Sequence, residues 1–305
     1  MIMISRSHII NCSFEIIMRR SIILTTLVSA AMAMSAAHAN PVPVVAAENV
    51  YGGIAQEIGG SNVAVTSILS NPDQDPHEFE ASALTARQIA DAKLVIYNGA
   101  DYDPWMMKLL SASRAPSRNV IEVARLIHKR PGDNPLVWYD PTAISAAAKA
   151  LAESLSTLDL MNRAEYAERY AAFERSMRPL VDHIAELRKR YAGTAVTATE
   201  PVFGYMADAL GLKMRNGRFQ LAVMNGTEPS ARDIAAFEKD LKTRAVKVLF
   251  YNSQTGNALA ERMRKIATDS GVSIVGVTET QPPGMTYPQW MTWQLDALAR
   301  ALGER

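Results

Sequence analysis

The sequence is poor in the residues that most often hold metals or cross-links. It has one cysteine, Cys12, and five histidines among 305 residues. Cys12 lies in an N-terminal segment that we expect to be removed, so the remaining chain has no disulfide and no thiolate ligand. Positive and negative charges nearly cancel, at a net +1, so nothing in the composition indicates a nucleic-acid partner. The length and the 48% hydrophobic content suit a chain of two domains.

Several catalytic motifs are also absent. The sequence contains no H-E-x-x-H, no G-x-S-x-G and no P-loop, and no spare histidine is placed to act as a base. These absences argue against the common metalloprotease, serine-hydrolase and nucleotide-hydrolase classes. We therefore expect a binding protein, not an enzyme.

No apolar run is long enough to span a membrane. The longest candidate, residues 21–35, follows Arg19-Arg20 and falls short of the ~20 residues of a membrane span. Ala37-His38-Ala39 resembles a signal-peptidase site. We predict that residues 1–39 are a signal segment cleaved after Ala39, with Met18 as the true start. Because Cys12 precedes the apolar run, a lipid-anchored cysteine is not expected, and the product should be a soluble periplasmic protein with a net charge of about −1.

After residue 40, short apolar runs alternate with helix-like stretches, which predicts two doubly wound α/β lobes. Apolar residues recur at spacings of three and four from Tyr166 to Tyr191, which predicts one long helix between the lobes. The expected limits are an N-terminal lobe at 40–160, a linking helix at 161–191 and a C-terminal lobe at 192–305.

Three possible metal ligands follow predicted strands. His77 lies after the strand at 63–69, Glu200 after the strand ending at Thr199, and Glu279 after the strand ending at Thr278. Ligands of open α/β sheets bind at the carboxyl ends of strands. One imidazole and two carboxylates suit Mn²⁺, Zn²⁺ or Fe²⁺.

Each residue also has a plainer explanation. Glu200 precedes Pro201 and could cap the next helix. Glu279 could be an exposed loop acid, and His77 a surface histidine. His128 and His183 are predicted to be surface residues.

These motifs resemble a known family. The stretches Asp75-Pro76-His77-Glu78-Phe79-Glu80, Val95-Ile96-Tyr97-Asn98-Gly99-Ala100, Asn134-Pro135-Leu136-Val137-Trp138 and Thr199-Glu200-Pro201-Val202-Phe203-Gly204-Tyr205 are similar to the zinc and manganese solute-binding proteins of bacterial ABC transporters. The resemblance implies two α/β lobes joined by a rigid helix, with a divalent metal bound between them. It also implies delivery of that metal to an ABC transporter permease, and we expect a monomer.

The resemblance assigns the first, third and fourth ligands to His77, Glu200 and Glu279. Leu136 stands where the family usually has its second ligand, a histidine, and leucine cannot coordinate a metal. A bidentate glutamate, a water or Asp133 could fill the gap, or the site could have lost tight binding. In the last case the protein is a homologue that binds another ligand or partner. An exported metallohydrolase using an activated water is the remaining alternative. The choice between Zn²⁺ and Mn²⁺ stays open.

Overall fold

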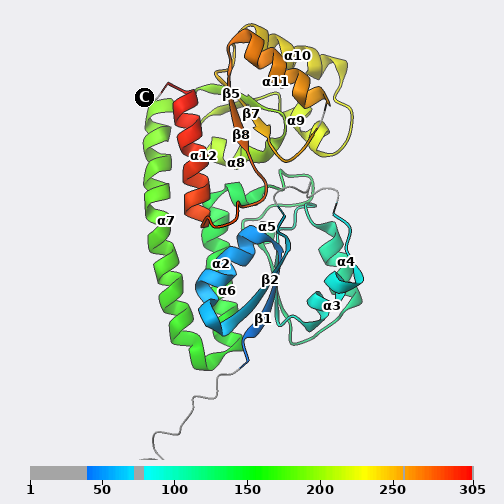
Figure 1. The fold of residues 1–305 in the computed structure, drawn as a ribbon, viewed down its shortest axis with the longest axis vertical. Helices are drawn as coiled ribbons and strands as arrows, with labels where there is room; N and C mark the ends of the chain where they lie inside the picture. Colours follow the sequence, from blue (N-terminus) through cyan, green and yellow to red (C-terminus); the bar gives the residue numbers. More distant parts are fainter. Residues whose placement is uncertain (1–39, 72–78, 257, 304–305) are drawn as a thin grey trace, which may run out of the picture. The chain divides into compact units, whose positions relative to one another are not determined.

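Two four-stranded parallel sheets form the framework of the described part of the chain (Figure 1). The computed structural model describes residues 40–71, 79–256 and 258–303. Residues 41–305 form one compact unit. The first sheet has the order β2-β1-β3-β4 and the second the order β6-β5-β7-β8, so both sheets have the same topology.

The first half of this unit contains β1 (Val42–Glu48), α2 (Asn49–Gly59), β2 (Val63–Leu69), α3 (Ala83–Asp91), β3 (Leu94–Tyr97), α4 (Pro104–Ala112), β4 (Asn119–Glu122), α5 (Val123–Leu126) and α6 (Pro141–Leu158). The long helix α7 follows at Arg163–Tyr191. The second half contains β5 (Ala195–Ala198), α8 (Gly204–Ala209), β6 (Lys213–Arg215), α9 (Gly217–Met224), α10 (Ala231–Lys242), β7 (Val248–Asn252), α11 (Ala258–Ser270), β8 (Ser273–Val277) and α12 (Tyr287–Ala301). Short 3₁₀ turns lie at Gly60–Asn62, Val137–Tyr139, Leu160–Asn162 and Pro201–Phe203.

The predicted fold class is confirmed: two doubly wound α/β lobes with one long helix between them in sequence. Most of the apolar positions predicted to form one face of α7 are buried, among them Tyr166, Phe173 and Leu187, whereas Tyr170 and Tyr191 are half-buried. The sequence analysis did not predict β6, α9 or α10. Among the described residues no helix is long and apolar enough to cross a membrane. The predicted lobe limits at 160 and 192 stay predictions, and the signal segment lies outside the described residues.

Helix starts are fixed by local sequence. The Asp140 carboxylate accepts a hydrogen bond from the Thr142 N–H at 2.8 Å, and Pro141 is the first residue of α6, where its missing N–H costs nothing. At α12, Thr286 and Gln289 form a reciprocal capping box. These caps orient α6 and α12, and both helices pack against α7 (Figure 1). One apolar cluster includes buried side chains from both sheets and from these helices.

Hydrogen bonds join the two halves at the carboxyl ends of their sheets. Asn49, just after β1, donates to the Gln281 carbonyl oxygen at 2.8 Å and accepts from the Gln281 N–H at 3.1 Å. The Tyr139 hydroxyl donates to the Thr278 carbonyl oxygen at 2.6 Å. The carboxyl end of β1 therefore lies against the loop that follows β8.

Candidate metal site

The carboxylates of Glu200 and Glu279 are buried at the carboxyl end of the second sheet. Glu200 lies two residues after the end of β5 and Glu279 two residues after the end of β8, and the residues are 4% and 3% exposed. Glu279 is therefore not an exposed loop acid. Glu200 stands at the start of the Pro201–Phe203 turn, but its side chain makes no capping hydrogen bond there. Two buried carboxylates need polar partners, because burial of an unpaired charge is costly.

All four carboxylate oxygens accept hydrogen bonds from uncharged donors. The Asn252 Nδ2 group donates to Glu200 Oε2 at 3.0 Å and to Glu279 Oε1 at 2.5 Å. The Thr255 hydroxyl donates to Glu200 Oε1 at 2.6 Å, and the Tyr102 hydroxyl donates to Glu279 Oε2 at 2.8 Å. Two oxygens from different loops thus converge on one nitrogen.

Gln254 fixes the backbone of Glu279. Its Oε1 atom accepts hydrogen bonds from the N–H groups of Glu279 and Thr280, at 2.6 and 2.8 Å, and its Nε2 group donates to the Thr280 hydroxyl at 3.0 Å. The Asn252 Oδ1 atom in turn accepts from the Gln254 N–H at 3.1 Å, which holds the Asn252 Nδ2 group toward the carboxylates. The second half of the chain therefore presents Glu200 and Glu279 in a preorganised arrangement.

Tyr102 is supplied by the first half of the chain, from an unusual loop. Gly99, Ala100 and Asp101 all have positive φ, at 81°, 50° and 66°. A non-glycine residue pays roughly 1–2 kcal/mol for this conformation. Asp103 holds the loop, because its carboxylate accepts from the N–H groups of Asn98 and Gly99 at 2.7 and 2.9 Å. Burial, together with the nearby Glu279 carboxylate, raises the pKa of Tyr102 well above its ordinary value, so the hydroxyl stays protonated and donates.

A second pair of buried carboxyl groups lies behind this loop. Glu48, the last residue of β1, is 5% exposed, and neither of its carboxyl oxygens meets a hydrogen-bond donor. Burial and the neighbouring Asp103 carboxyl raise the pKa of Glu48 well above its usual range. Burial also raises the pKa of Asp103, to about 6. Since Asp103 already accepts two backbone hydrogen bonds, we infer that Glu48 carries the proton of the pair and donates to Asp103.

His77 lies outside the described residues, so its position relative to Glu200 and Glu279 stays a prediction. Within the described ranges, no group of three histidine, cysteine or acidic residues is close enough to hold a metal ion. Leu136 is fully buried in the apolar cluster. His128 is exposed, as predicted. His183 is half-buried, with its Nε2 atom 3.8 Å from Asp296 Oδ1, so His183 is less solvated than expected.

Sequence reasoning missed Asn252, Thr255 and Tyr102. Asn252 carried a usable signal, because it ends the buried strand β7 at the same sheet edge as Glu200 and Glu279. As an amide it is not among the side chains from which a zinc or manganese site is ordinarily predicted, which are histidine and the carboxylates. Nothing local marks Tyr102, whose contact with Glu279 joins residues 177 positions apart.

Comparison with known proteins identifies the family. The model of the ZnuA family, zinc-uptake complex component A, periplasmic, matches residues 44–301. The chain belongs to the ZnuA family. Its members are solute-binding components of transport systems, and the family match confirms the resemblance seen in the sequence.

Individual relatives are distant but match over most of their length. The zinc-binding protein TroA of Treponema pallidum is 27% identical over 252 residues, which cover 77% of this chain and 80% of TroA. The metal ABC transporter substrate-binding lipoprotein SloC of Streptococcus mutans is 23% identical over 282 residues, which cover 86% of this chain and 90% of SloC. Among solved structures, TroA has a TM-score of 0.73 at 23% identity and covers 87% of this chain and 99% of its own. The laminin-binding adhesin Lmb of Streptococcus agalactiae has a TM-score of 0.71 at 24% identity, and the match covers 86% of this chain and 99% of Lmb. At these identities the structural likeness shows the fold alone.

Proposed function

We propose that this ZnuA-family protein captures a divalent transition metal, Zn²⁺ or Mn²⁺, with His77, Glu200 and Glu279 and delivers it to an ABC transporter permease. The metal is cargo, not a catalytic cofactor. The protein would act in the periplasm, as a soluble chain released by cleavage after Ala39.

The observation that carries this proposal is the convergence of Glu200 and Glu279 on Asn252 Nδ2. Here the four oxygens accept from an amide and two hydroxyls, groups that orient a carboxylate without neutralising its charge. An arrangement of that kind keeps negative charge available for a cation. His77, which comes eight residues after the end of β2 in the sequence, would complete the site from the other lobe.

The metals named for the relatives support a transition-metal cargo, but they do not identify which metal this protein binds. TroA is named as zinc-binding, and a Streptococcus pyogenes relative, MtsA, as an iron ABC transporter substrate-binding lipoprotein. Carboxylate ligands favour Mn²⁺ on ligand type, whereas the general order of affinity favours Zn²⁺ over Mn²⁺. With Leu136 in the second position, three protein ligands leave a coordination position for water or for the second oxygen of a glutamate.

The direct test is calorimetric titration of the metal-stripped protein with Zn²⁺ and Mn²⁺ in parallel. We expect one ion per chain, and we expect His77→Ala to remove most of the affinity because it deletes the imidazole ligand. His183→Ala is the matched control, since His183 contacts Asp296 on α12 and should leave binding unchanged. Equal losses from both substitutions would refute the assignment of His77.

A second candidate function rests on Leu136. Its complete burial in the apolar cluster favours a homologue with a degenerate site that binds another ligand or partner. Absence of binding to either ion would select that candidate. Metal-dependent hydrolysis of simple esters by the loaded protein would instead select the exported metallohydrolase.

A further inference from the structure

The outer strand of the first sheet has backbone groups directed away from the sheet. β4 pairs only with β3, in parallel register, and the Asn119 N–H donates to the Lys93 carbonyl oxygen at 2.9 Å. Because successive residues of a strand point their N–H and C=O groups to opposite sides, Asn119 and Ile121 face β3. Val120 therefore directs its N–H and C=O groups outward, and Glu122 its N–H, whereas the Glu122 carbonyl belongs to the start of α5.

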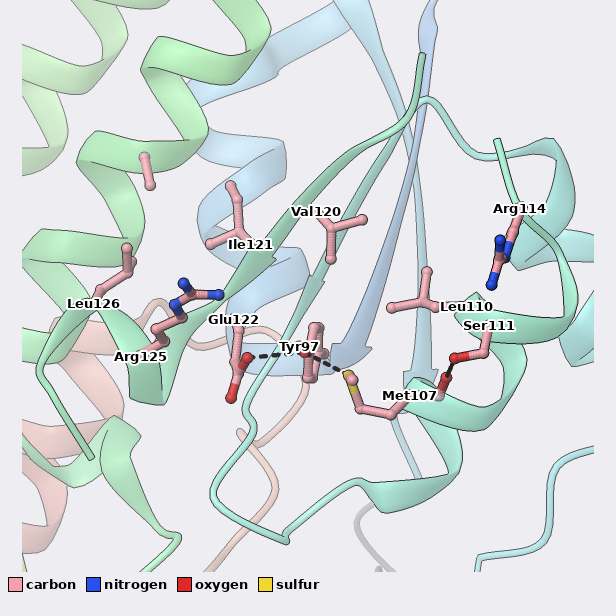
Figure 2. A pocket seen from close by; sticks show the side chains of 11 residues that line it. Tyr97, Met107, Leu110, Ser111, Arg114, Val120, Ile121, Glu122, Arg125 and Leu126 are labelled. Carbon is pink, nitrogen blue, oxygen red and sulfur yellow. Dashed lines mark hydrogen bonds between the residues drawn. The ribbon is translucent and has the colours of Figure 1, made fainter. Parts of the chain in front are cut away.

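A groove of about 760 Å³ runs beside this edge (Figure 2). α4 borders it on one side and α5 on the other, so the groove has the position of an additional strand between two helical layers. Three large apolar side chains that line it are solvent-exposed: Met107 by 52%, Val120 by 47% and Leu126 by 39%. Single exposed apolar residues are ordinary, but three in one groove indicate an interaction surface.

The groove is also positively charged at both ends. Arg114 follows α4, Arg125 belongs to α5, and Figure 2 shows them on opposite sides of Val120. Neither side chain forms an ion pair or hydrogen bond with any residue that the structure describes. The one carboxylate lining the groove, Glu122, lies 3.1 Å from the Tyr97 hydroxyl, which donates to it. Two arginines are thus left to meet negative charge from outside.

We propose that this groove binds an extended, acidic polypeptide segment of a partner protein, which adds to β4 as a fifth strand of the first sheet. Such strand addition gains its affinity from main-chain hydrogen bonds and its specificity from alternate side chains. Here Val120 and Glu122 supply the main-chain groups. Met107 and Leu126 contact apolar side chains of the incoming strand, and Arg114 and Arg125 pair with its carboxylates. None of the residues lining this groove is proposed to bind metal, so either proposal can fail without the other.

The test uses a synthetic peptide of alternating glutamate and valine, blocked at both ends, and a counterpart in which lysine replaces glutamate. Binding to the purified protein is followed through its backbone amide resonances. We expect the acidic peptide at millimolar concentration to shift the amides of residues 119–122, and the lysine counterpart to bind at least about tenfold more weakly.

Val120→Pro distinguishes strand addition from simple apolar contact. Proline removes the outward N–H, and the hydrogen bonds that Asn119 and Ile121 make with β3 remain, so the sheet should stay intact. We expect about tenfold weaker binding than for Val120→Ala, which loses side-chain contact but keeps the N–H. Arg114→Glu together with Arg125→Glu should reverse the preference between the two peptides.

Three outcomes would overturn the proposal: no shifts at 119–122 with the acidic peptide, equal binding of both peptides, or equal binding by the proline and alanine variants. Thermal unfolding of each variant verifies that the sheet is intact. If Val120→Pro fails to fold, exchange protection of the Val120 amide in the unsubstituted protein decides the matter. Protection by the acidic peptide supports strand addition, and its absence overturns it.

Discussion

Replacing Asn252 with aspartate should convert the shared hydrogen-bond donor into a third carboxylate. The side chain keeps nearly the same shape. A carboxyl oxygen would then stand where the Asn252 Nδ2 atom now lies, 3.0 Å from Glu200 Oε2 and 2.5 Å from Glu279 Oε1. Asn252→Asp therefore probes whether the two carboxylates converge, and it does so without any metal.

The expected magnitude follows from Coulomb's law. Counting one of the two neighbouring carboxylates, a like charge about 4 Å away repels the new one by about 4 kcal/mol at an effective dielectric constant of about 20. A repulsion of that size corresponds to about three pKa units, so the new carboxyl group should hold a proton up to about pH 7 instead of about pH 4. In the unfolded chain the same group keeps its ordinary pKa.

The sign of the pH effect is then fixed. Because the folded-state pKa lies above the unfolded-state value, the free energy of unfolding of Asn252→Asp relative to wild type should fall between about pH 4 and about pH 7. The total loss should approach about 4 kcal/mol and then stay constant. A divalent cation should reverse the loss, since three carboxylates bind it better than two.

The assay is denaturant unfolding of metal-stripped wild type and Asn252→Asp across this pH range, repeated with excess Mn²⁺. The control is Asn225→Asp, at an exposed asparagine that follows α9. If the difference between Asn252→Asp and wild type does not vary with pH, then Glu200 and Glu279 do not meet at residue 252 and our account of the site is wrong.

Three further predictions concern the surroundings of this site. Glu48→Gln should leave stability unchanged near pH 4 and raise it at pH 8, as measured by thermal unfolding. The pKa values of Glu48 and Asp103 are raised in the folded state, so these groups stabilise the folded protein in acid. That contribution is lost in the wild type as the pH rises through the folded-state pKa values, whereas glutamine at position 48 cannot ionise. An equal pH profile in wild type and variant would contradict this. Tyr102→Phe should weaken metal binding about 10- to 100-fold by calorimetry, whereas Tyr205→Phe, which loses a hydrogen bond to the Asn134 carbonyl oxygen, should not. Leu136→His should destabilise the metal-free protein by about 1–3 kcal/mol and tighten Zn²⁺ binding. Without tightening, residue 136 does not adjoin the metal.

Much of the fold was predictable because its signals are local. Buried parallel strands such as Leu94–Tyr97 are short apolar runs, and α7 shows its buried face through spacings of three and four. The helices α9 and α10 were missed although they are regular. The apolar periodicity of α9 is weak, whereas α10 is strongly amphipathic with Phe237 and Leu241 on its buried face, so its pattern was a usable signal.

The sequence by itself determined the two-lobed α/β fold and the placement of Glu200 and Glu279 after strands, because strand ends are marked by local pattern and parallel strands end at one edge. It also determined the loss of a possible ligand at Leu136. Only the tertiary structure decided that both glutamates are buried, that they share the Asn252 amide, and that Tyr102 from the other half of the chain donates to Glu279. These contacts join residues 27 to 177 positions apart, and hydrogen bonds over such separations depend on the packing of whole sheets, which no local pattern encodes.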